Sequence, residues 1–254
     1  MQGFLAPVTT IEPRPTDPIS LLYVRSYLIL RLGVGVIGIA LRFALVLCDG
    51  LLFHGKPFPR VSISAYYYSG MRDLMVGAIC STGVFLLAYK IAERNLDNTL
   101  SLVAGAGALV AALSPPSLPA GVAPGPLQQL IGTAVCAWIH FGAAVVLLVS
   151  LGALSFFLGL REGARDTQVG KLPPEFWRIF HWVCAGLIAA ALIWMGLFSL
   201  FPHLGPSRTL LYGETLSLCA FGVSWLLKGL ELDTLRGHPA PLLSKQVSVS
   251  PNRA

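Results

Sequence analysis

Charged residues are scarce in this sequence. Asp, Glu, Lys and Arg make up 12% of its 254 residues, against about 25% in an ordinary soluble domain. Hydrophobic residues make up 55%, and the mean hydropathy is +0.71. This balance excludes a soluble domain of any size and predicts an integral membrane protein with several helical spans. The basic residues that give the net charge of +6 are dispersed around the apolar runs, which indicates membrane topology rather than binding to nucleic acid.

The sequence also lacks the short motifs that commonly mark catalysis or metal binding. It contains no GxSxG, no HExxH and no paired histidines,. Its five cysteines show no CxxC spacing, and all fall within or beside apolar runs. We therefore interpret the cysteines as small buried hydrophobes rather than disulfides or zinc ligands. From these absences we expect neither a metal site nor a cofactor.

The apolar runs predict an all-α bundle of about six transmembrane helices over residues 21–233. The expected spans are 27–48, 69–90, 98–114, 128–160, 177–201 and 209–231,. The third span has a core of small residues, GAGALVAAL, which favours close helix packing in a membrane. Residues 1–20 are expected to form a flexible tail before a first span that is retained as an anchor. Residues 234–254 are expected to form a disordered tail.

The orientation of the spans follows from the Lys and Arg residues in the connections between them. The turn after the second span, the loop after the fourth span and the C-terminal tail hold most of these residues. Because basic residues accumulate on the cytoplasmic side of a membrane, we expect both termini to be cytoplasmic. Residues 62–73 then lie on the extracytoplasmic side. The expected location is a membrane, and we favour a bacterial inner membrane.

The first span carries three charged residues along one helical line. Arg31, Arg42 and Asp49 are 11 and 7 residues apart, which at about 100° per residue places them within ~20° of one another around the helix. We expect Arg31 to extend to the cytoplasmic headgroups and Asp49 to lie outside the membrane. Arg42 is flanked by apolar residues on both sides. A buried guanidinium favours a carboxylate or phosphate partner.

The stretch SISAYYYSGMRD, residues 62–73, places three tyrosines and a charged pair at the start of the second span. Tyrosines and a cation are typical of the belt that lies at the lipid headgroups. Consecutive residues of a helix point about 100° apart, so at most one or two of the rings can line a site. For the same reason Asp73 does not pair neatly with Arg72. The sequence predicts that Asp73 meets Arg42 of the first span.

Ionisable residues also lie in the later spans. His140 and Glu214 fall inside apolar runs, whereas His181 and Lys228 are expected near the cytoplasmic interface,. With the predicted orientation, many polar residues gather in the outer half of the bundle, which predicts a polar cavity that opens outward. The candidate ligand-binding residues are Arg42, Ser64, Tyr67, Arg72, Asp73, His140 and Glu214.

Two resemblances to known families follow from these motifs. The stretch from Tyr67 through MRD and GVFLLAY, together with GETLSLCAFGVSWLLKG from Gly213, resembles an uncharacterised bacterial family of six-span or seven-span membrane proteins that is distantly similar to DRAM-type proteins. This resemblance implies the span count and no reaction. A weaker one is to the seven-span hydrolases of the alkaline ceramidase and adiponectin receptor kind. It implies a zinc site with Ser62 or Ser64, Asp73 and His140, but the last span lacks the HxxxH pair of those enzymes.

Three functions are compatible with the sequence. The first is a membrane protein without enzymatic activity, which binds a lipid headgroup or a small polar ligand in the outer cavity or serves as a subunit of a membrane complex. The second is an intramembrane hydrolase or lipid-modifying enzyme that uses Asp73, Glu214 and His140. The third is a transporter or channel along the line of Arg31, Arg42 and Asp49. The expected partners are membrane lipids and either further copies of the chain or another membrane protein.

Overall fold

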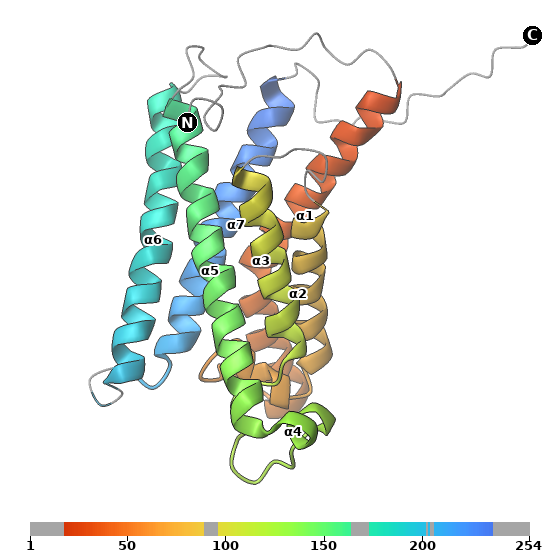
Figure 1. Ribbon diagram of the computed structural model, residues 1–254, viewed down its shortest axis with the longest axis vertical. Helices are drawn as coiled ribbons and strands as arrows, with labels where there is room; N and C mark the ends of the chain where they lie inside the picture. Colours follow the sequence, from red (N-terminus) through yellow and green to blue (C-terminus); the bar gives the residue numbers. More distant parts are fainter. Residues whose placement is uncertain (1–17, 89–95, 164–172, 202, 204–205, 236–254) are drawn as a thin grey trace, which may run out of the picture.

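The chain folds into a bundle of long helices, seen from the side in the computed structural model of Figure 1. The structure describes residues 18–88, 96–163, 173–201, 203 and 206–235. In that part of the chain every regular element is helical, and the elements are α1 (Pro18–Asp49), a π-helical turn (Gly50–His54), a 3-10 helix (Ser64–Tyr68), α2 (Arg72–Leu87), α3 (Leu96–Leu113), α4 (Pro126–Ile131), α5 (Thr133–Gly163), α6 (Pro174–Leu200) and α7 (Thr209–Leu235). The predicted all-α architecture is confirmed. Most of both predicted tails lies outside the described residues.

Five helices of the described part are long and apolar enough to cross a membrane. They cover Leu28–His54, Leu96–Leu113, Thr133–Arg161, Pro174–Leu200 and Thr209–Lys228. Length and hydropathy therefore make the chain an integral membrane protein. The second of the six predicted spans corresponds to α2, which has 16 residues, and a helix that crosses the hydrocarbon core needs about 17 to 25.

Two predicted spans have different boundaries in the structure. The first span was expected over 27–48, and the candidate span in the structure covers Leu28–His54, so the predicted start agrees and the end lies six residues further on. The fourth span was expected over 128–160 as one helix. It is instead divided at Gly132, whose φ of 93° lies in a region open to glycine,. The short helix α4 and the long helix α5 result.

The segments 50–71 and 114–132 lie at the same end of the bundle, together with the last turn of α6 and the first turn of α7, at the bottom of Figure 1. We call this the cap end. The first turn of α1 and the last turn of α7 lie at the opposite, terminal end. This alternation is the up-and-down arrangement that short connections between neighbouring helices produce.

Small residues set the closest approaches between helices. A Cβ on Gly105 of α3 would lie 2.8 Å from the carbonyl oxygen of Gly83 on α2. This agrees with the packing predicted from GAGALVAAL. A Cβ on Gly222 of α7 would likewise lie 2.8 Å from the carbonyl oxygen of Gly35 on α1. The seam between α1 and α7, where Arg42 lies, is therefore a backbone-to-backbone contact.

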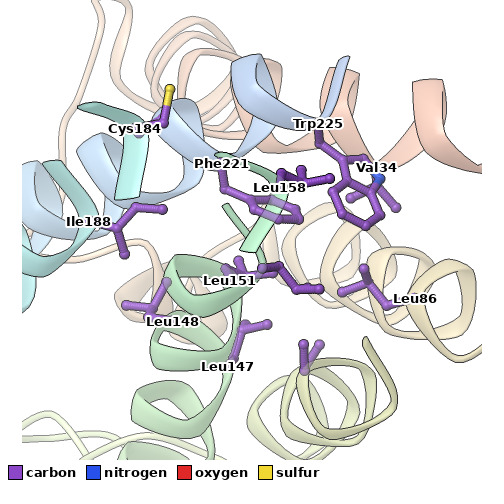
Figure 2. Packing of buried hydrophobic residues seen from close by; sticks show 14 of the residues in the cluster. Val34, Leu86, Leu147, Leu148, Leu151, Leu158, Cys184, Ile188, Phe221 and Trp225 are labelled. Atoms are coloured by element: carbon purple, nitrogen blue, oxygen red, sulfur yellow. The ribbon is translucent and has the colours of Figure 1, made fainter. Parts of the chain in front are cut away.

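The apolar core is shared by most of the long helices (Figure 2). Leucines along one face of α5 form its centre, and the residues around them come from α1, α2, α6 and α7: Val34, Leu86, Leu147, Leu148, Leu151, Leu158, Cys184, Ile188, Phe221 and Trp225. Large apolar side chains also cover the outside of the helices, such as Trp138, which is 73% exposed, and Ile193, which is 64% exposed. An apolar exterior around a packed core is the arrangement expected in lipid.

Candidate functional site

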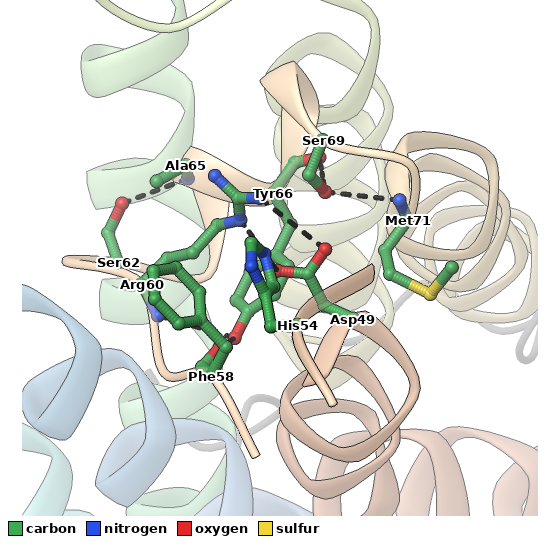
Figure 3. A network of polar contacts seen from close by, with 9 residues as sticks. All are labelled: Asp49, His54, Phe58, Arg60, Ser62, Ala65, Tyr66, Ser69 and Met71. Atoms are coloured by element: carbon green, nitrogen blue, oxygen red, sulfur yellow. Dashed lines mark hydrogen bonds and ion pairs between the residues drawn. The ribbon is translucent and has the colours of Figure 1, made fainter. Parts of the chain in front are cut away.

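A buried ion pair organises the cap end. The Asp49 side chain is almost fully buried at the end of α1, and Arg60 Nε donates to its Oδ2 at 2.9 Å while Nη2 donates to Oδ1 at 3.4 Å (Figure 3). His54 Nε2 lies 3.8 Å from the same Oδ2, and the His54 ring stacks on Phe58 with the ring centres 4.0 Å apart. Asp49 was expected to lie outside the membrane. It lies at the helix end as expected, but it is enclosed by the loop that follows.

The three consecutive tyrosines have three separate roles. Tyr66 is buried and donates its hydroxyl proton to the Phe58 carbonyl oxygen at 3.1 Å. Tyr67 accepts a hydrogen bond from Arg72 Nη2 at 2.7 Å, and the Arg72 guanidinium carbon lies 4.3 Å from the centre of its ring. Tyr68 donates to the Pro116 carbonyl oxygen at 2.8 Å. The cluster therefore fastens different loop segments to one another, and its rings point in different directions, as predicted.

Burial of Tyr66 has a consequence at alkaline pH. Removal from water raises the pKa of the Tyr66 phenol above its ordinary value of 10.0, although a hydrogen bond from the Arg60 backbone partly opposes this,. The folded protein therefore holds the phenol proton more tightly than the unfolded chain does. The stability that protonated Tyr66 contributes is fully present below pH 10 and falls as the pH rises above it. Above pH 10, we expect the melting temperature in detergent to fall less steeply with pH for Tyr66→Phe than for the wild type. Parallel curves for the two proteins above pH 10 would contradict it.

Glu214 ties the cap to α7. One of its carboxylate oxygens accepts the Ile63 N–H at 2.5 Å, and the Leu211 N–H donates to the Val61 carbonyl oxygen at 3.0 Å. Next to these contacts, the hydroxyl oxygens of Ser62 and Ser64 are 3.0 Å apart. Ser64 and Glu214, which were predicted to bind a ligand, thus participate in contacts that hold residues 61–65 against the first turns of α7.

Asp73 does not meet Arg42. It is exposed in the first turn of α2 and makes no hydrogen bond or ion pair with any described residue. A carboxylate in this position interacts favourably with the positive end of the helix dipole, so its presence there needs no partner on another helix. The predicted pairing of Asp73 with Arg42 is therefore wrong.

His140 has a local role at the end of α3. Its Nδ1 lies 2.8 Å from the Ala111 carbonyl oxygen and 3.0 Å from the Ser114 carbonyl oxygen. Because both partners are acceptors, Nδ1 carries the proton in this arrangement. Carbonyl groups at the end of a helix have no intrahelical partner, so His140 acts as a cap that joins α5 to α3.

Arg42 is the charged residue of the predicted set whose presence in α1 the protein contacts explain least. It lies 14 residues after Leu28 and 12 before His54, near the middle of the candidate span. It is half-buried, and its guanidinium carbon lies 5.3 Å from the centre of the Tyr212 ring. Within the described residues it makes no hydrogen bond and no ion pair. Tyr212 is in the first turn of α7, so the long Arg42 side chain extends toward the cap end.

A second polar cluster lies in the other half of the bundle, where the sequence predicted interfacial residues. Arg31 is only 2% exposed, its Nε donates to the Trp225 carbonyl oxygen at 3.0 Å, and its guanidinium carbon lies 4.3 Å from the Trp225 ring centre. His181 is buried with Nδ1 2.8 Å from Ser224 Oγ, and Lys228 is also buried. The sequence predicted that Arg31 and Lys228 extend to the headgroups and that His181 is interfacial; the structure instead buries all three side chains against neighbouring helices, and their depth in a membrane stays a prediction.

The seven predicted residues therefore do not share one set of contacts. Arg42 lies at the seam of α1 and α7, Ser64 and Glu214 belong to the cap, Tyr67 and Arg72 bind each other, Asp73 is exposed, and His140 caps α3. A hollow found in the structure lies instead between α5 and α6 and is lined by none of the seven. In the described part of the chain, no three His, Cys, Asp or Glu side chains are placed to hold a metal ion.

The chain was also compared with known proteins. No family model matches it, and neither the curated proteins nor the solved structures contain a match. What the fold and the polar contacts define is a multi-helix integral membrane protein with five candidate spans. The site residues must therefore be interpreted from their own chemistry.

Proposed function

We propose that this integral membrane protein binds the headgroup of an anionic phospholipid at the seam between α1 and α7, with Arg42 as the ligand of the phosphate. The proposal includes the predicted orientation, in which both termini are cytoplasmic, the cap end is extracytoplasmic and α2 completes a set of six spans in a bacterial inner membrane. The resemblance to DRAM-type proteins stays a prediction about family and adds no reaction.

The observation that carries the proposal is the electrostatic state of Arg42. A charged side chain inside a membrane span is unfavourable by about 2.5 kcal/mol or more, and such residues are usually paired or face water. The described residues give Arg42 an aromatic ring and no anion. A guanidinium binds phosphate through two parallel N–H donors. Contact with the face of the Tyr212 ring uses none of those donors, so they are available to a lipid.

The surroundings of Arg42 suit a lipid rather than a free anion. Large apolar side chains in the same stretches of the two helices are exposed, namely Phe43 and Leu47 of α1 and Leu216 of α7, so acyl chains can lie against them. The guanidinium lies beside the first turn of α7, so the side chain carries its charge from the middle of the span toward the cap end. Arginine in such positions reaches the interface with its charge and keeps its stem in the apolar region.

The two other functions receive less support. No hydrogen bond or ion pair joins any two of Asp73, Glu214 and His140 within the described residues, although a base and its partner should be within hydrogen-bond reach. The line proposed for a transporter is occupied at both ends, because Arg31 binds the Trp225 carbonyl and Asp49 binds Arg60. A subunit role remains the alternative, since a carboxylate of another membrane protein could take the place of the phosphate.

The test compares lipid binding by two charge-matched variants. Arg42→Gln removes the proposed ligand, and Arg208→Gln removes an exposed charge at the same end of the bundle. Purified proteins are titrated in detergent with phosphatidylglycerol or phosphatidylcholine, and bound lipids are counted by native mass spectrometry. A hydrogen bond to a charged group contributes about 1.5–3 kcal/mol, so Arg42→Gln should weaken phosphatidylglycerol binding about tenfold or more.

The control variant should leave the affinity for phosphatidylglycerol unchanged, and phosphatidylcholine should bind more weakly than phosphatidylglycerol to the wild type. Equal binding of phosphatidylglycerol by the wild type and Arg42→Gln would overturn the proposal. Loss of a higher oligomer or of a co-purified subunit in Arg42→Gln, with lipid binding unchanged, would instead assign Arg42 to a protein interface.

A further inference from the structure

An apolar groove lies between α5 and α6 on the outside of the bundle. It has a volume of about 660 Å³, and its lining includes Gly152 and Phe156 of α5 and Trp182, Gly186, Ala189 and Ile193 of α6. Gly186 and Ala189 are exposed, and a Cβ on Gly186 would meet nothing within 4 Å. The groove is thus an open channel along α6, where small residues leave space between larger ones.

The length of the groove corresponds to one leaflet of a bilayer. Along α6 the lining runs from Trp182 to Ile193, which is 11 residues or about 16 Å at the helical rise of 1.5 Å per residue. Half of the hydrocarbon core of a bilayer is about 15 Å thick. The groove begins two turns after the first residue of α6, Pro174, and ends two turns before the last, Leu200, so it lies along the middle of α6 with its Trp182 end toward the terminal end.

A positive charge lies at the terminal end of this groove. Arg178 is one helical turn before Trp182, and its guanidinium carbon lies 5.6 Å from the centre of the Trp182 ring. Its Nε is buried and has no hydrogen-bond partner among the described residues. The Trp182 ring stacks on Phe156 with the ring centres 6.0 Å apart. A cation beside an apolar channel complements a molecule that has an anionic head and an apolar chain.

We propose that the groove between α5 and α6 binds one acyl chain of an anionic phospholipid from the leaflet at the terminal end, whose phosphate binds Arg178. This site shares no residue with the seam of α1 and α7 and lies in the opposite leaflet, so it is independent of the function proposed for Arg42. The Arg178 cation beside Trp182, the apolar lining and a groove as long as one leaflet agree on this occupant. An apolar helix from a second copy of the chain would cover the apolar lining but would supply no anion to Arg178.

Glycines of α6 provide a matched pair of variants. Gly186→Leu places a side chain in the groove, whereas Gly196→Leu adds the same side chain to the same helix outside the groove lining. A Cβ at either position would meet nothing within 4 Å, and leucine is more favourable in a helix than glycine. Both variants should therefore fold, and any difference between them reports on the groove.

The experiment counts phosphatidylglycerol molecules bound to the purified full chain in detergent by native mass spectrometry. Gly186→Leu and Arg178→Gln should each weaken one bound phosphatidylglycerol about tenfold, while Gly196→Leu and Arg208→Gln bind as the wild type does. Combining variants distinguishes this site from the one at Arg42. Arg42→Gln and Gly186→Leu should each lose one bound lipid, and the double variant should lose both.

Unchanged phosphatidylglycerol binding by both Gly186→Leu and Arg178→Gln would overturn the inference, whatever the result for Arg42→Gln. A lower oligomeric mass for Gly186→Leu than for Gly196→Leu in light scattering, without a change in lipid count, would also overturn it and would assign the groove to a second copy of the chain.

Discussion

Replacing Asp49 with asparagine is expected to lower the free energy of unfolding by about 3 kcal/mol, at the lower end of the range for breaking a buried ion pair. The substitution keeps the shape of the side chain but leaves the Arg60 guanidinium without its charged partner. Because Arg60 retains 24% side-chain exposure, water reduces the penalty and the upper end of the range is not reached. Thermal unfolding in detergent, followed by circular dichroism, measures the loss.

A double variant separates the ion pair from the packing around it. Asp49→Asn combined with Arg60→Gln removes both charges, so no buried charge is left unpaired, and we expect a smaller loss than in Asp49→Asn alone. If the two single variants and the double variant were all as stable as the wild type, Asp49 and Arg60 would not organise the cap end as described.

Replacing Trp225 with alanine is expected to lower the free energy of unfolding by about 3–5 kcal/mol, the range for removing a large aromatic side chain from a core. Trp225 is 1% exposed and packs against Phe221 with the ring centres 5.1 Å apart. Its ring also covers the Arg31 guanidinium at 4.3 Å, and this contact adds to the apolar packing. The substitution should therefore also remove a contact of Arg31 in the second polar cluster.

The control for this prediction is Trp138→Ala on α5. Trp138 is 73% exposed, so its removal leaves no internal cavity, and a surface change of this kind usually alters stability by less than 0.5 kcal/mol. Trp225→Phe should lie between the two, because the smaller ring keeps part of the packing. A similar stability for Trp225→Ala and Trp138→Ala would show that Trp225 does not hold α7 in the core.

The helices could be predicted from the sequence because hydrophobic runs and their breaks are local signals. The long apolar segments appear as helices, and GAGALVAAL packs through Gly105 against Gly83 as its small residues indicate,. The break at Gly132 was missed, since an apolar run continues on both sides of it. The stretch 62–73 was recognised as a separate feature and its tyrosines were interpreted as a belt at the headgroups, but the hydrogen bonds of two of them to loop carbonyls were not predicted.

The contacts between helices could not be predicted, because they depend on how far each helix extends and how it is rotated. Arg31 was expected to extend to the headgroups because long basic side chains commonly do so, whereas its guanidinium binds the Trp225 carbonyl of α7. Asp73 is exposed in the first turn of α2, whereas Arg42 lies beside Tyr212 of α7. His181, Ser224 and Trp225 were not joined into a cluster, since nothing in a single sequence shows that α6 and α7 meet at these positions.

The central claim is that a lipid phosphate lies against the Arg42 guanidinium. The most direct test is solid-state NMR of the protein in bilayers that contain phosphatidylglycerol, with the guanidinium carbons of arginine labelled with carbon-13 and the Arg178→Gln background used to remove the second site. Dipolar dephasing by phosphorus-31 should include a contribution that disappears in Arg42→Lys, because lysine has no guanidinium carbon. If the average dephasing per labelled arginine were the same in the protein with Arg42 and in the Arg42→Lys variant, the claim would be contradicted.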